Sequence, residues 1–410
     1  MVGFTSVSLN VKWLASPQAQ HIINVAESVS LEANDIQKFR AQFPDVDIDL
    51  IGSAIHQAWL RKRAFSRWGV PTAFLMTTDG LSQATRPVVA NWHAQWITEN
   101  IGANSHVLDL TCGLGFDVAA IARAGHRVTA LELDPEIAAL ATRNLEPFGA
   151  TVICADATTF EISDDVDVIF VDPARRDPKA AKTATGDTVR NFSSRNWSPS
   201  WDFVQRLATS HRVMAKVAPG VDDDTITDWD ATFVSVDGDL VEALLTSNGT
   251  GTRKALLFDQ ATYKSTVITG GSETGTADIG NFLITPDTSL VRARALSAIA
   301  QRCDAGLVNP HIAWLTSNNR AVVESLMTDS PRIAQAFEIL EVVSFSSKTL
   351  KHDIAKFDAS AVTIMTRGVQ LNVDELRKKI SGKLQKSAPE LVVAIFRDDA
   401  GNKAIIARRL

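Results

Sequence analysis

The chain has 410 residues, of which 45% are hydrophobic and 21% are charged, and its formal net charge is -6. This composition predicts a globular protein of about two to four domains, and the charge neither requires nor excludes a nucleic-acid partner, because local basic patches decide such binding. The three cysteines stand singly and without metal-ligand spacing, so we expect no metal site and a reducing compartment. The N-terminus lacks a basic-then-apolar signal and no apolar run approaches the ~20 residues that span a bilayer, which predicts a cytoplasmic protein without a membrane partner.

The first region, residues 1–90, is predicted to be helical. Ser16 followed by Pro17 is typical of a helix start, and apolar residues between positions 50 and 59 recur at helical spacing. Residues 60–68 then place basic residues around two aromatic ones, Phe65 and Trp68. This stretch is either a solvated helix face with both aromatic side chains packed inward or a surface that touches a polyanion, and the sequence favours the first interpretation.

Another helix is expected to begin just before the first predicted strand. Thr85 is expected to cap this helix and Pro87 to lie in its first turn. Val89, Trp92 and Trp96 would then lie on one side of it.

Residues 106–117 are the stretch around which the chain is organised. A short apolar run at residues 106–110 leads into Gly113 and Gly115, and a helix is expected over residues 117–124. Glycine lets the backbone approach a ligand where a Cβ atom would obstruct it, and the following helix points free N–H groups toward the turn. We therefore expect a ligand at this turn.

Two classes of ligand use such a turn, and the flanking residues separate them. A dinucleotide-binding turn has a small residue three positions after the second glycine, where this chain has Val118. Asp109 before the turn and Asp117 after it would repel a pyrophosphate but suit a cation. The ammonium and sulfonium groups of S-adenosylmethionine are such cations.

The strands that follow are each predicted to end in a polar residue. Glu132 follows the second strand, and its carboxylate can accept both hydroxyls of a ribose. Asp156 follows the third strand and can accept a hydrogen bond from an adenine amino group, and Asp172 follows the fourth. The carboxyl ends of parallel strands form the ligand-binding edge of an α/β fold. These three strands are expected at residues 127–131, 151–154 and 166–171.

Taken together, residues 107–176 resemble a class I S-adenosylmethionine-dependent methyltransferase, with Asp-x-x-x-Gly-x-Gly, an acid after strand two, Asp-Ala after strand three and Asp-Pro after strand four. The resemblance implies an α/β fold, with a Rossmann-like seven-stranded sheet over residues 91–260 and S-adenosyl-L-methionine as the cofactor. The Thr85 segment is similar to the lead-in of the trimethylguanosine-synthase-like methyltransferases, where it borders the cofactor pocket. The resemblance assigns cofactor binding to Asp109, Thr111, Gly113, Gly115, Asp117, Glu132, Asp156 and Ala157.

The rest of this core is less regular. Residues 183–200 form a polar and basic stretch that leaves the sheet edge where a substrate would arrive. A fifth strand is expected at residues 211–217, in which Lys216 either meets a phosphate or pairs with an acid. Residues 232–245 are expected to form a hairpin across Asp-Gly, and with residues 254–258 to supply antiparallel edge strands.

The C-terminal part of the chain shows a second pattern. Residues 262–277 are rich in Thr and Gly and are expected to be a boundary or a long loop. Residues 280–333 are similar to the connector domain of a family of bacterial methyltransferase-like proteins, although Thr285 stands where that family commonly has Glu. Residues 334–410 have the predicted order β-α-β-α-β-β, which makes an α+β domain and resembles a THUMP-like domain.

The THUMP-like resemblance implies an RNA partner, because that module presents RNA in THUMP-bearing enzymes. The basic residues of the segment fit this role, but they also fit a solvated face because acids are interleaved with them. No oligomeric state follows from the sequence. The basic residues are Lys348, Lys351, Arg367, Arg377, Lys378, Lys379, Lys383 and Lys386.

Methyl transfer from a sulfonium depends on orientation and the exclusion of water more than on acid or base catalysis. Asp172 and the carbonyl of Pro173 are expected to accept hydrogen bonds from an exocyclic amine, which would aim its lone pair at the methyl group. The amine methyltransferases that this motif resembles usually have Pro and an aromatic residue next, whereas this chain has Ala174 and Arg175. Arg175 can stack on a base or grip a phosphate, so we count it as catalytic with Asp172 and Pro173.

Three functions remain open on these residues. The first is an enzyme that methylates a nitrogen of an RNA base. The altered motif after strand four supports a second, a non-catalytic RNA-binding protein on a methyltransferase scaffold, and a small-molecule methyltransferase is a third. The Asp-Pro-x-Arg pattern is also similar to uracil C5-methyltransferases, but these need a thiolate, and Pro219 and Gly220 follow the fifth strand instead.

Overall fold

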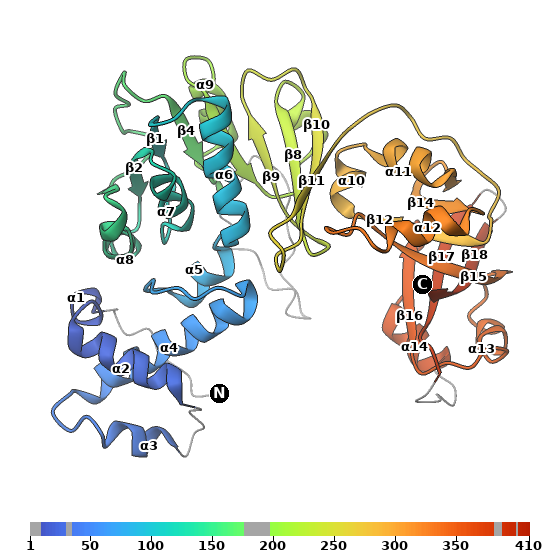
Figure 1. Ribbon diagram of the computed structural model, residues 1–410, viewed down its shortest axis with the longest axis horizontal. Coiled ribbons are helices and arrows are strands. Elements are labelled where there is room, and N and C mark those ends of the chain that lie inside the picture. The colour runs from blue at the N-terminus through green and yellow to red at the C-terminus, as the bar shows by residue number, and fades with distance from the viewer. Residues whose placement is uncertain (1–9, 30–34, 176–196, 381–387, 399–400) are drawn as a thin grey trace. The chain divides into compact units, whose positions relative to one another are not determined.

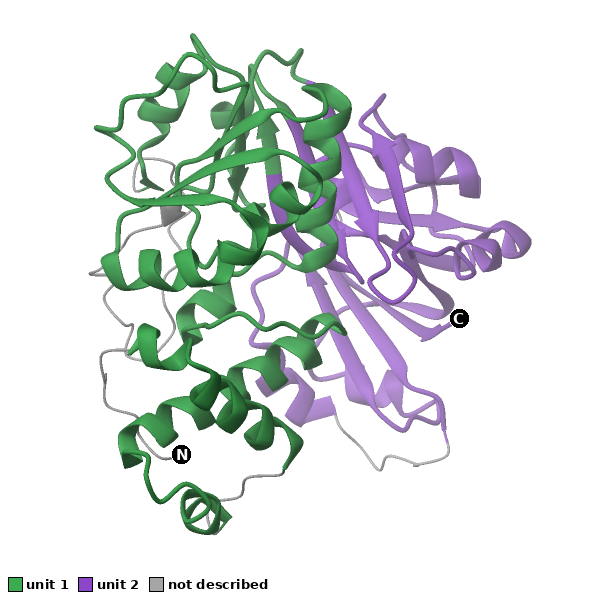
Figure 2. Cartoon of the chain, turned by 60° about the vertical axis from the view of Figure 1, so that its left-hand side comes forward, with its two compact units in different colours: residues 1–230, 244–251 green, residues 231–243, 252–410 purple. Residues whose placement is uncertain are grey.

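The computed structural model describes residues 10–29, 35–175, 197–380, 388–398 and 401–410. The chain forms two compact units (Figure 2). Unit 1 holds Met1–Asp230 and Leu244–Gly251, and unit 2 holds Ala231–Ala243 and Thr252–Leu410. Among the helices of the described residues, none has the length and apolar content needed to cross a membrane.

Six helices of the described chain precede the first strand of unit 1 (Figure 1). Ser16 caps the second helix as predicted, because its hydroxyl accepts a hydrogen bond from the amide of Ala19 at 3.2 Å. The prediction that Thr85 caps the sixth helix is wrong: the N-cap residue is Arg86, which makes no side-chain capping bond. The helices are α1 (Val11–Leu14), α2 (Pro17–Ser28), α3 (Asp35–Arg40), α4 (Ile48–Trp68), α5 (Thr78–Gln83) and α6 (Pro87–Asn100).

This helical region has an apolar core that reaches the methyltransferase-like part of unit 1. Ile51 and Trp68 of α4 belong to one buried cluster with Leu114, which lies in the glycine-rich turn, and with Leu140. The ring of Trp68 also packs on the ring of Phe116, with centroids 5.0 Å apart. The helices before residue 90 therefore support the turn directly.

Five strands of unit 1 pair in parallel, as the βαβ pattern predicts, and a helix lies between successive strands except between β3 and β4, which a loop joins. β1 pairs with β2 on one side and with β4 on the other. β2 and β3 therefore lie on one side of β1, and β4 and β7 lie on the other side. α/β proteins bind ligands at such a switch point in the strand order. The elements are β1 (His106–Asp109), α7 (Phe116–Arg123), β2 (Arg127–Glu132), α8 (Pro135–Leu145), β3 (Thr151–Cys154), β4 (Val168–Val171), α9 (Trp201–Leu207) and β7 (Val213–Val217).

The larger sheet has the order β11-β10-β8-β9-β7-β4-β1-β2-β3, so two strands are added to the seven expected. The turn between β8 and β9 has positive φ at Asp237 and Gly238, as an Asp-Gly hairpin requires. β10 pairs in parallel with β8, so the prediction that it is an antiparallel edge strand is wrong. β11 pairs antiparallel with β10 and lies in the segment expected to be a loop. These strands are β8 (Asp230–Val236), β9 (Asp239–Thr246), β10 (Arg253–Phe258) and β11 (Ser265–Thr269).

Unit 2 contains a seven-stranded sheet with the order β13-β14-β12-β15-β18-β17-β16. The elements from β15 onward follow the predicted order β-α-β-α-β-β. The same sheet includes β12 to β14, which come from residues 280–333. The elements are β12 (Phe282–Pro286), α10 (Thr288–Arg292), α11 (Leu296–Cys303), β13 (Ala305–Asn309), β14 (Ile312–Ser317), α12 (Arg320–Leu326), β15 (Ala334–Ser344), α13 (Leu350–Ile354), β16 (Val362–Arg367), α14 (Val373–Ile380), β17 (Leu391–Asp398) and β18 (Gly401–Arg409).

The C-terminal sheet is buried on both faces of β17. Leu391, Val393 and Ile395 belong to one apolar cluster, and Val392 and Phe396 belong to the other. Side chains alternate between the two faces of a strand, so burial on both faces explains why β17 is an unbroken apolar run.

Candidate active site

The glycine-rich turn is tied to the strands on both sides of β1. The amide of Leu110 donates to the carbonyl of Phe170 in β4, and the amide of Cys112 donates to the carbonyl of Leu131 in β2, each at 2.9 Å. The carboxyl of Asp109 accepts a hydrogen bond from the amide of Thr111 at 2.9 Å. The turn is thus fixed at the carboxyl edge of the sheet.

The two glycines of the turn have different roles. Gly115 has φ +90°, and a Cβ atom there would lie 2.8 Å from the side chain of Leu145, so close packing on α8 requires glycine. Gly113 has φ +53°, and a Cβ atom there would have nothing within 4 Å. Only Gly113 therefore leaves open space beside the backbone, which suits the approach of a ligand.

Glu132 is connected to the turn by hydrogen bonds. One of its carboxylate oxygens accepts from the amide of Gly113 at 3.1 Å and the other from the amide of Asp134 at 2.9 Å. Asp156 lies at the end of the next strand, is exposed, and accepts from the amide and hydroxyl of Thr158 at 2.8 and 2.7 Å. The groups that Glu132 and Asp156 offer are carboxylate oxygens, which can accept hydrogen bonds from the hydroxyl and amino groups of a nucleoside.

Asp117, in the first turn of α7, lies at the centre of a buried network. One carboxylate oxygen is 2.8 Å from Nδ1 of His93, whose side chain is completely buried. The other accepts a hydrogen bond from the hydroxyl of Thr85 at 2.6 Å and lies 3.7 Å from Nζ of Lys216. Thr85 therefore serves this network rather than the start of α6.

Lys216 joins the network to the motif after β4. Its Nζ donates to the hydroxyl of Thr85 at 2.8 Å and lies 2.5 Å from a carboxylate oxygen of Asp172. The amide of Asp172 donates to the hydroxyl of Thr111 at 2.7 Å, which links the same residue to the glycine-rich turn. Of the two roles expected for Lys216, pairing with an acid is the one seen.

The two acids that flank the turn have opposite pKa shifts. Burial raises the pKa of Asp109 to about 8, and the charges of Asp117 and Asp172 add to this effect, although the Thr111 amide and Lys216 oppose it. Burial alone would also raise the pKa of Asp117, but Lys216, His93 and Thr85 outweigh it and lower that pKa to about 2. At neutral pH, Asp117 is therefore ionised and Asp109 is largely protonated.

The remaining predicted site residues lie around this network or outside the description. Pro173 is buried directly after Asp172, and Ala157 is half-buried directly after Asp156. Arg175 lies in the short strand β5 (Ala174–Arg175), whose backbone pairs with β6 (Trp197–Ser198). Its side chain, and most of the basic stretch expected at residues 183–200, lie outside the described residues.

His93 is the site residue that the sequence prediction missed. It lies on the buried side of α6 with Ala90, Ala94 and Ile97. Ala90 lies three residues before His93 and Ile97 four residues after it, which indicates a buried position, and a buried histidine requires a polar partner. The spacing gives no indication that the partner is Asp117.

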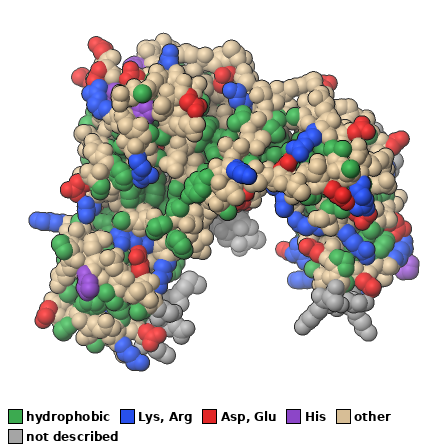
Figure 3. Space-filling view, in the orientation of Figure 1, with side chains coloured by type: hydrophobic (Ala, Val, Ile, Leu, Met, Phe, Trp, Pro, Cys, Tyr) green, Lys and Arg blue, Asp and Glu red, His purple; other side chains and the backbone are tan. Residues whose placement is uncertain are grey.

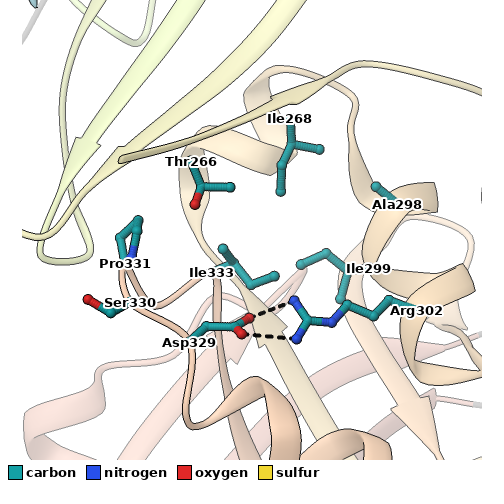
Figure 4. A pocket seen from close by; sticks show the side chains of 9 residues that line it. All are labelled: Thr266, Ile268, Ala298, Ile299, Arg302, Asp329, Ser330, Pro331 and Ile333. Atoms are coloured by element: carbon teal, nitrogen blue, oxygen red, sulfur yellow. Dashed lines mark hydrogen bonds and ion pairs between the residues drawn. The ribbon is translucent and has the colours of Figure 1, made fainter. Parts of the chain in front are cut away.

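A separate cavity of about 180 Å³ lies in unit 2 (Figure 4). Arg302 and Asp329 face each other in its wall and form two hydrogen bonds of 2.7 and 2.9 Å. The rest of the wall is largely apolar, with Ile268, Ile299 and Ile333. The charged groups Arg302 and Asp329 of this cavity thus satisfy each other.

Comparison with known proteins agrees with this geometry. Residues 107–185 match the family model of a methyltransferase domain, and residues 334–409 match that of a THUMP domain-like family. The first match begins in β1 and includes the turn, Glu132, Asp156 and Asp172. The second match covers the elements from β15 to β18.

Relatives and solved structures extend the similarity beyond the two domains. Two uncharacterised S-adenosylmethionine-dependent methyltransferases from strains of Mycobacterium tuberculosis are each 26% identical over 381 residues, which is 88% of this chain and 96% of theirs. A crystal structure from Porphyromonas gingivalis W83, named as a methyltransferase, superposes with a TM-score of 0.68 at 20% identity, covering 96% of this chain and 98% of that one. The chain therefore carries a class I S-adenosylmethionine-dependent methyltransferase domain and a C-terminal THUMP-like domain, and the cofactor of this class of domain is S-adenosyl-L-methionine.

Proposed function

We propose that the protein methylates a nitrogen of an RNA base at the edge formed by Asp172 and the glycine-rich turn. The observation that carries this proposal is the 2.5 Å ion pair between Lys216 and Asp172, together with the 2.7 Å bond from the Asp172 amide to Thr111. These contacts hold the Asp172 carboxylate beside the turn where the cofactor is expected. A fixed acceptor at that place can orient an amine, and orientation supplies much of the acceleration in such a transfer.

S-adenosyl-L-methionine supplies the electrophilic methyl group when it is bound. Gly113 leaves space for it, and Glu132 and Asp156 offer acceptors for its ribose and adenine. Asp109, Thr111 and Gly115 shape the turn from inside, and Ala157 follows Asp156. We assign Asp117 to positioning, because its bonds go to His93, Thr85 and Lys216.

On the acceptor side, the Asp172 carboxylate and the Pro173 carbonyl would accept hydrogen bonds from an exocyclic amine. The N–H groups of the substrate amine would then point toward Asp172 and Pro173, and the lone pair of the amine nitrogen would point toward the methyl group. We keep Arg175 as a group that stacks on the base or grips a phosphate.

The RNA part of the proposal depends on the C-terminal domain, which we place at residues 334–410 after a connector at residues 280–333. Six of its predicted RNA-binding residues are described, and all six are exposed. Blue basic and red acidic side chains are intermixed over this part of the molecule in Figure 3. The exposed basic residues are Lys348, Lys351, Arg367, Arg377, Lys378 and Lys379, whereas Lys383 and Lys386 lie outside the described residues.

Transfer of a labelled methyl group into total cellular RNA tests this function. We expect label in RNA with the wild-type chain and, after nucleoside analysis, on a base nitrogen. The Asp172→Asn variant, which keeps the size of the side chain, is the control and should label RNA much more slowly. Label in protein or small molecules alone would reject the RNA substrate while leaving a methyltransferase.

The altered motif supports a second candidate, a non-catalytic RNA-binding protein. Ala174 and Arg175 replace the residues that usually follow Asp-Pro, and their backbone is engaged in the β5–β6 pair. Calorimetry separates this candidate from an enzyme. Heat on titration with S-adenosyl-L-methionine, together with label transfer, supports the enzyme; RNA binding without either supports the scaffold.

A further inference from the structure

The solvent-facing side of α4 between residues 59 and 67 carries aromatic and basic side chains together. Trp59 is 46% exposed and Phe65 is 54% exposed, although the opposite side of the same helix is buried through Leu60, Ala64 and Trp68. We call this surface the α4 face; it consists of Trp59, Lys62, Arg63, Phe65 and Arg67, all exposed. The sequence interpretation that Phe65 and Trp68 both pack inward is therefore wrong for Phe65.

The aromatic ring at the centre of the α4 face is held in place by its neighbours. The rings of His56 and Trp59 stack, with centroids 5.6 Å apart and planes 17° apart. The guanidinium of Arg63 lies 5.2 Å from the centroid of the Trp59 ring. These residues lie three and four positions apart, so one turn of helix orients a flat aromatic surface next to a cation.

The basic residues of the α4 face contribute positive charge at fixed positions. Nζ of Lys62 donates to the carbonyl of Val29 at 2.6 Å, and a guanidinium nitrogen of Arg67 donates to the carbonyl of Leu81 at 2.9 Å. Both bonds go to neutral carbonyls, and they orient the two side chains at the surface of α4. The acid Glu27 lies instead beside the buried Arg61, at 3.7 Å.

A surface of this chemistry fits a single-stranded polyanion whose monomers carry flat rings. Bases stack on exposed aromatic side chains without regard to sequence, and neighbouring Lys and Arg residues contact the phosphates. The partner helix of a protein would instead meet aliphatic side chains, and in this fully described stretch the aliphatic residues, Leu60 and Ala64, are buried.

Through its buried side, α4 contacts the turn that forms the candidate site. Trp68 packs on Phe116, the residue directly after Gly115, with ring centroids 5.0 Å apart. Phe65 precedes Trp68 by three residues, a rise of about 4.5 Å along the helix. α4 lies beside α5 in Figure 1, and both helices belong to the same unit as β1 and α7.

We propose that the α4 face binds a single-stranded segment of the RNA substrate next to the nucleotide that is methylated. The inference rests on the proposed RNA function and adds a second contact, in the N-terminal region, to the one expected from the C-terminal domain. Trp59 and Phe65 stack on bases, and Lys62, Arg63 and Arg67 contact phosphates.

The test uses the full-length chain and fluorescence anisotropy with a labelled oligouridylate of about 20 nucleotides, long enough to exceed a single stacking site. The Trp59→Ala/Phe65→Ala variant should bind this probe about 10- to 100-fold more weakly, as loss of stacking on aromatic residues predicts. The Trp59→Phe/Phe65→Tyr variant keeps both rings and should bind within about threefold of wild type. Tyr263→Ala, which removes a ring that is 52% exposed in unit 2, should leave the affinity unchanged.

A second arm tests the charge. Arg63→Gln should reduce the slope of log affinity against log salt by about 0.7, the contribution of one phosphate contact on a single strand. Wild-type affinity in both the double-alanine variant and Arg63→Gln would overturn the inference, and so would equal losses in Tyr263→Ala. If the α4 variants bind RNA as wild type does and RNA is still methylated, the inference about the α4 face fails and the proposed function stands. If the wild-type protein neither binds nor methylates RNA, the inference and the proposed function both fail.

Discussion

The strand edge of unit 1 and the C-terminal domain of unit 2 use charged side chains in opposite ways. At the strand edge, Asp109 is 2% exposed and the side chains of Asp117 and Lys216 are each 12% exposed. Lys216 connects Asp117 and Asp172 in one network. In the C-terminal domain, Arg377 pairs with Asp374 at the helix surface, where both side chains are at least half exposed. Ionisable side chains that are buried close together are typical of a site of chemistry, whereas charged side chains that are dispersed and exposed suit the binding of a flexible polyanion.

The largest effect is expected from removing the cation at the centre of the buried network. Lys216→Met leaves Asp117 and Asp172 without their shared partner, and loss of one member of a buried ion pair destabilises a fold by about 3–5 kcal/mol. We expect a lower free energy of unfolding in urea and a methyl-transfer rate reduced by about 100-fold, since Asp172 loses its orientation.

The double variant Lys216→Met/Asp117→Asn is the matched control for this prediction. It removes one of the two charges that Lys216→Met leaves uncompensated, so it should recover part of the stability but not the rate. A Lys216→Met protein that transfers methyl groups as fast as wild type would show that the network has only a structural role.

The two turn glycines sharpen the comparison within the site. Gly115→Ala places a Cβ atom 2.8 Å from Leu145 at a positive φ, so we expect a loss of about 2–4 kcal/mol in urea unfolding. Gly113→Ala meets no neighbour and should lose only about 1–2 kcal/mol. Calorimetry should show the reverse order for the affinity for S-adenosyl-L-methionine, with the larger loss of affinity in Gly113→Ala.

Asp109 makes a pH-dependent prediction. Its folded-state pKa of about 8 lies above the usual value, so the native state holds a proton that the unfolded chain has released, and stability is lost as pH rises from about 4 to 8. Asp109→Asn removes this dependence and should gain stability relative to wild type by up to about 1.4 kcal/mol per pH unit in that window. Thermal unfolding at intervals from about pH 5 to pH 8 measures the difference, and parallel curves for the two proteins would contradict it.

The smallest effect is expected from removing exposed basic side chains of the C-terminal domain. Lys378→Gln/Lys379→Gln should leave the free energy of unfolding within about 0.5 kcal/mol of wild type. It should weaken the binding of total RNA modestly and lower the salt dependence of that binding. Binding and salt dependence equal to wild type would remove α14 from the RNA surface.

The positions of several candidate site residues at strand ends could be predicted from the sequence because each strand end carries its own local signal. The apolar run before Gly113, the acid at Glu132 and the Asp-Pro pair at Asp172 each lie within a few residues of the element that positions them. The network between elements could not be predicted in this way. Thr85 before Pro87 fits a helix cap equally well, and only the fold shows that its hydroxyl instead donates to Asp117, 32 residues later.

The same reasoning applies to the sheets. The Asp-Gly turn predicted the hairpin between β8 and β9 because turn chemistry is local. The parallel pairing of β10 with β8 depends on how the chain returns to the sheet, which no short pattern records. β11 was missed because its Thr-containing sequence is followed by a segment rich in Gly, which favours a loop.

Single-turnover transfer by the Asp172→Asn variant tests the central claim most directly, since Asp172 is the point where the turn, Lys216 and the acceptor are expected to meet. The account predicts that calorimetry finds S-adenosyl-L-methionine bound as tightly as by wild type, while transfer of the labelled methyl group to RNA slows by about 100-fold. Transfer at the wild-type rate, or an equal loss of cofactor binding, would contradict the assignment of Asp172 to the acceptor.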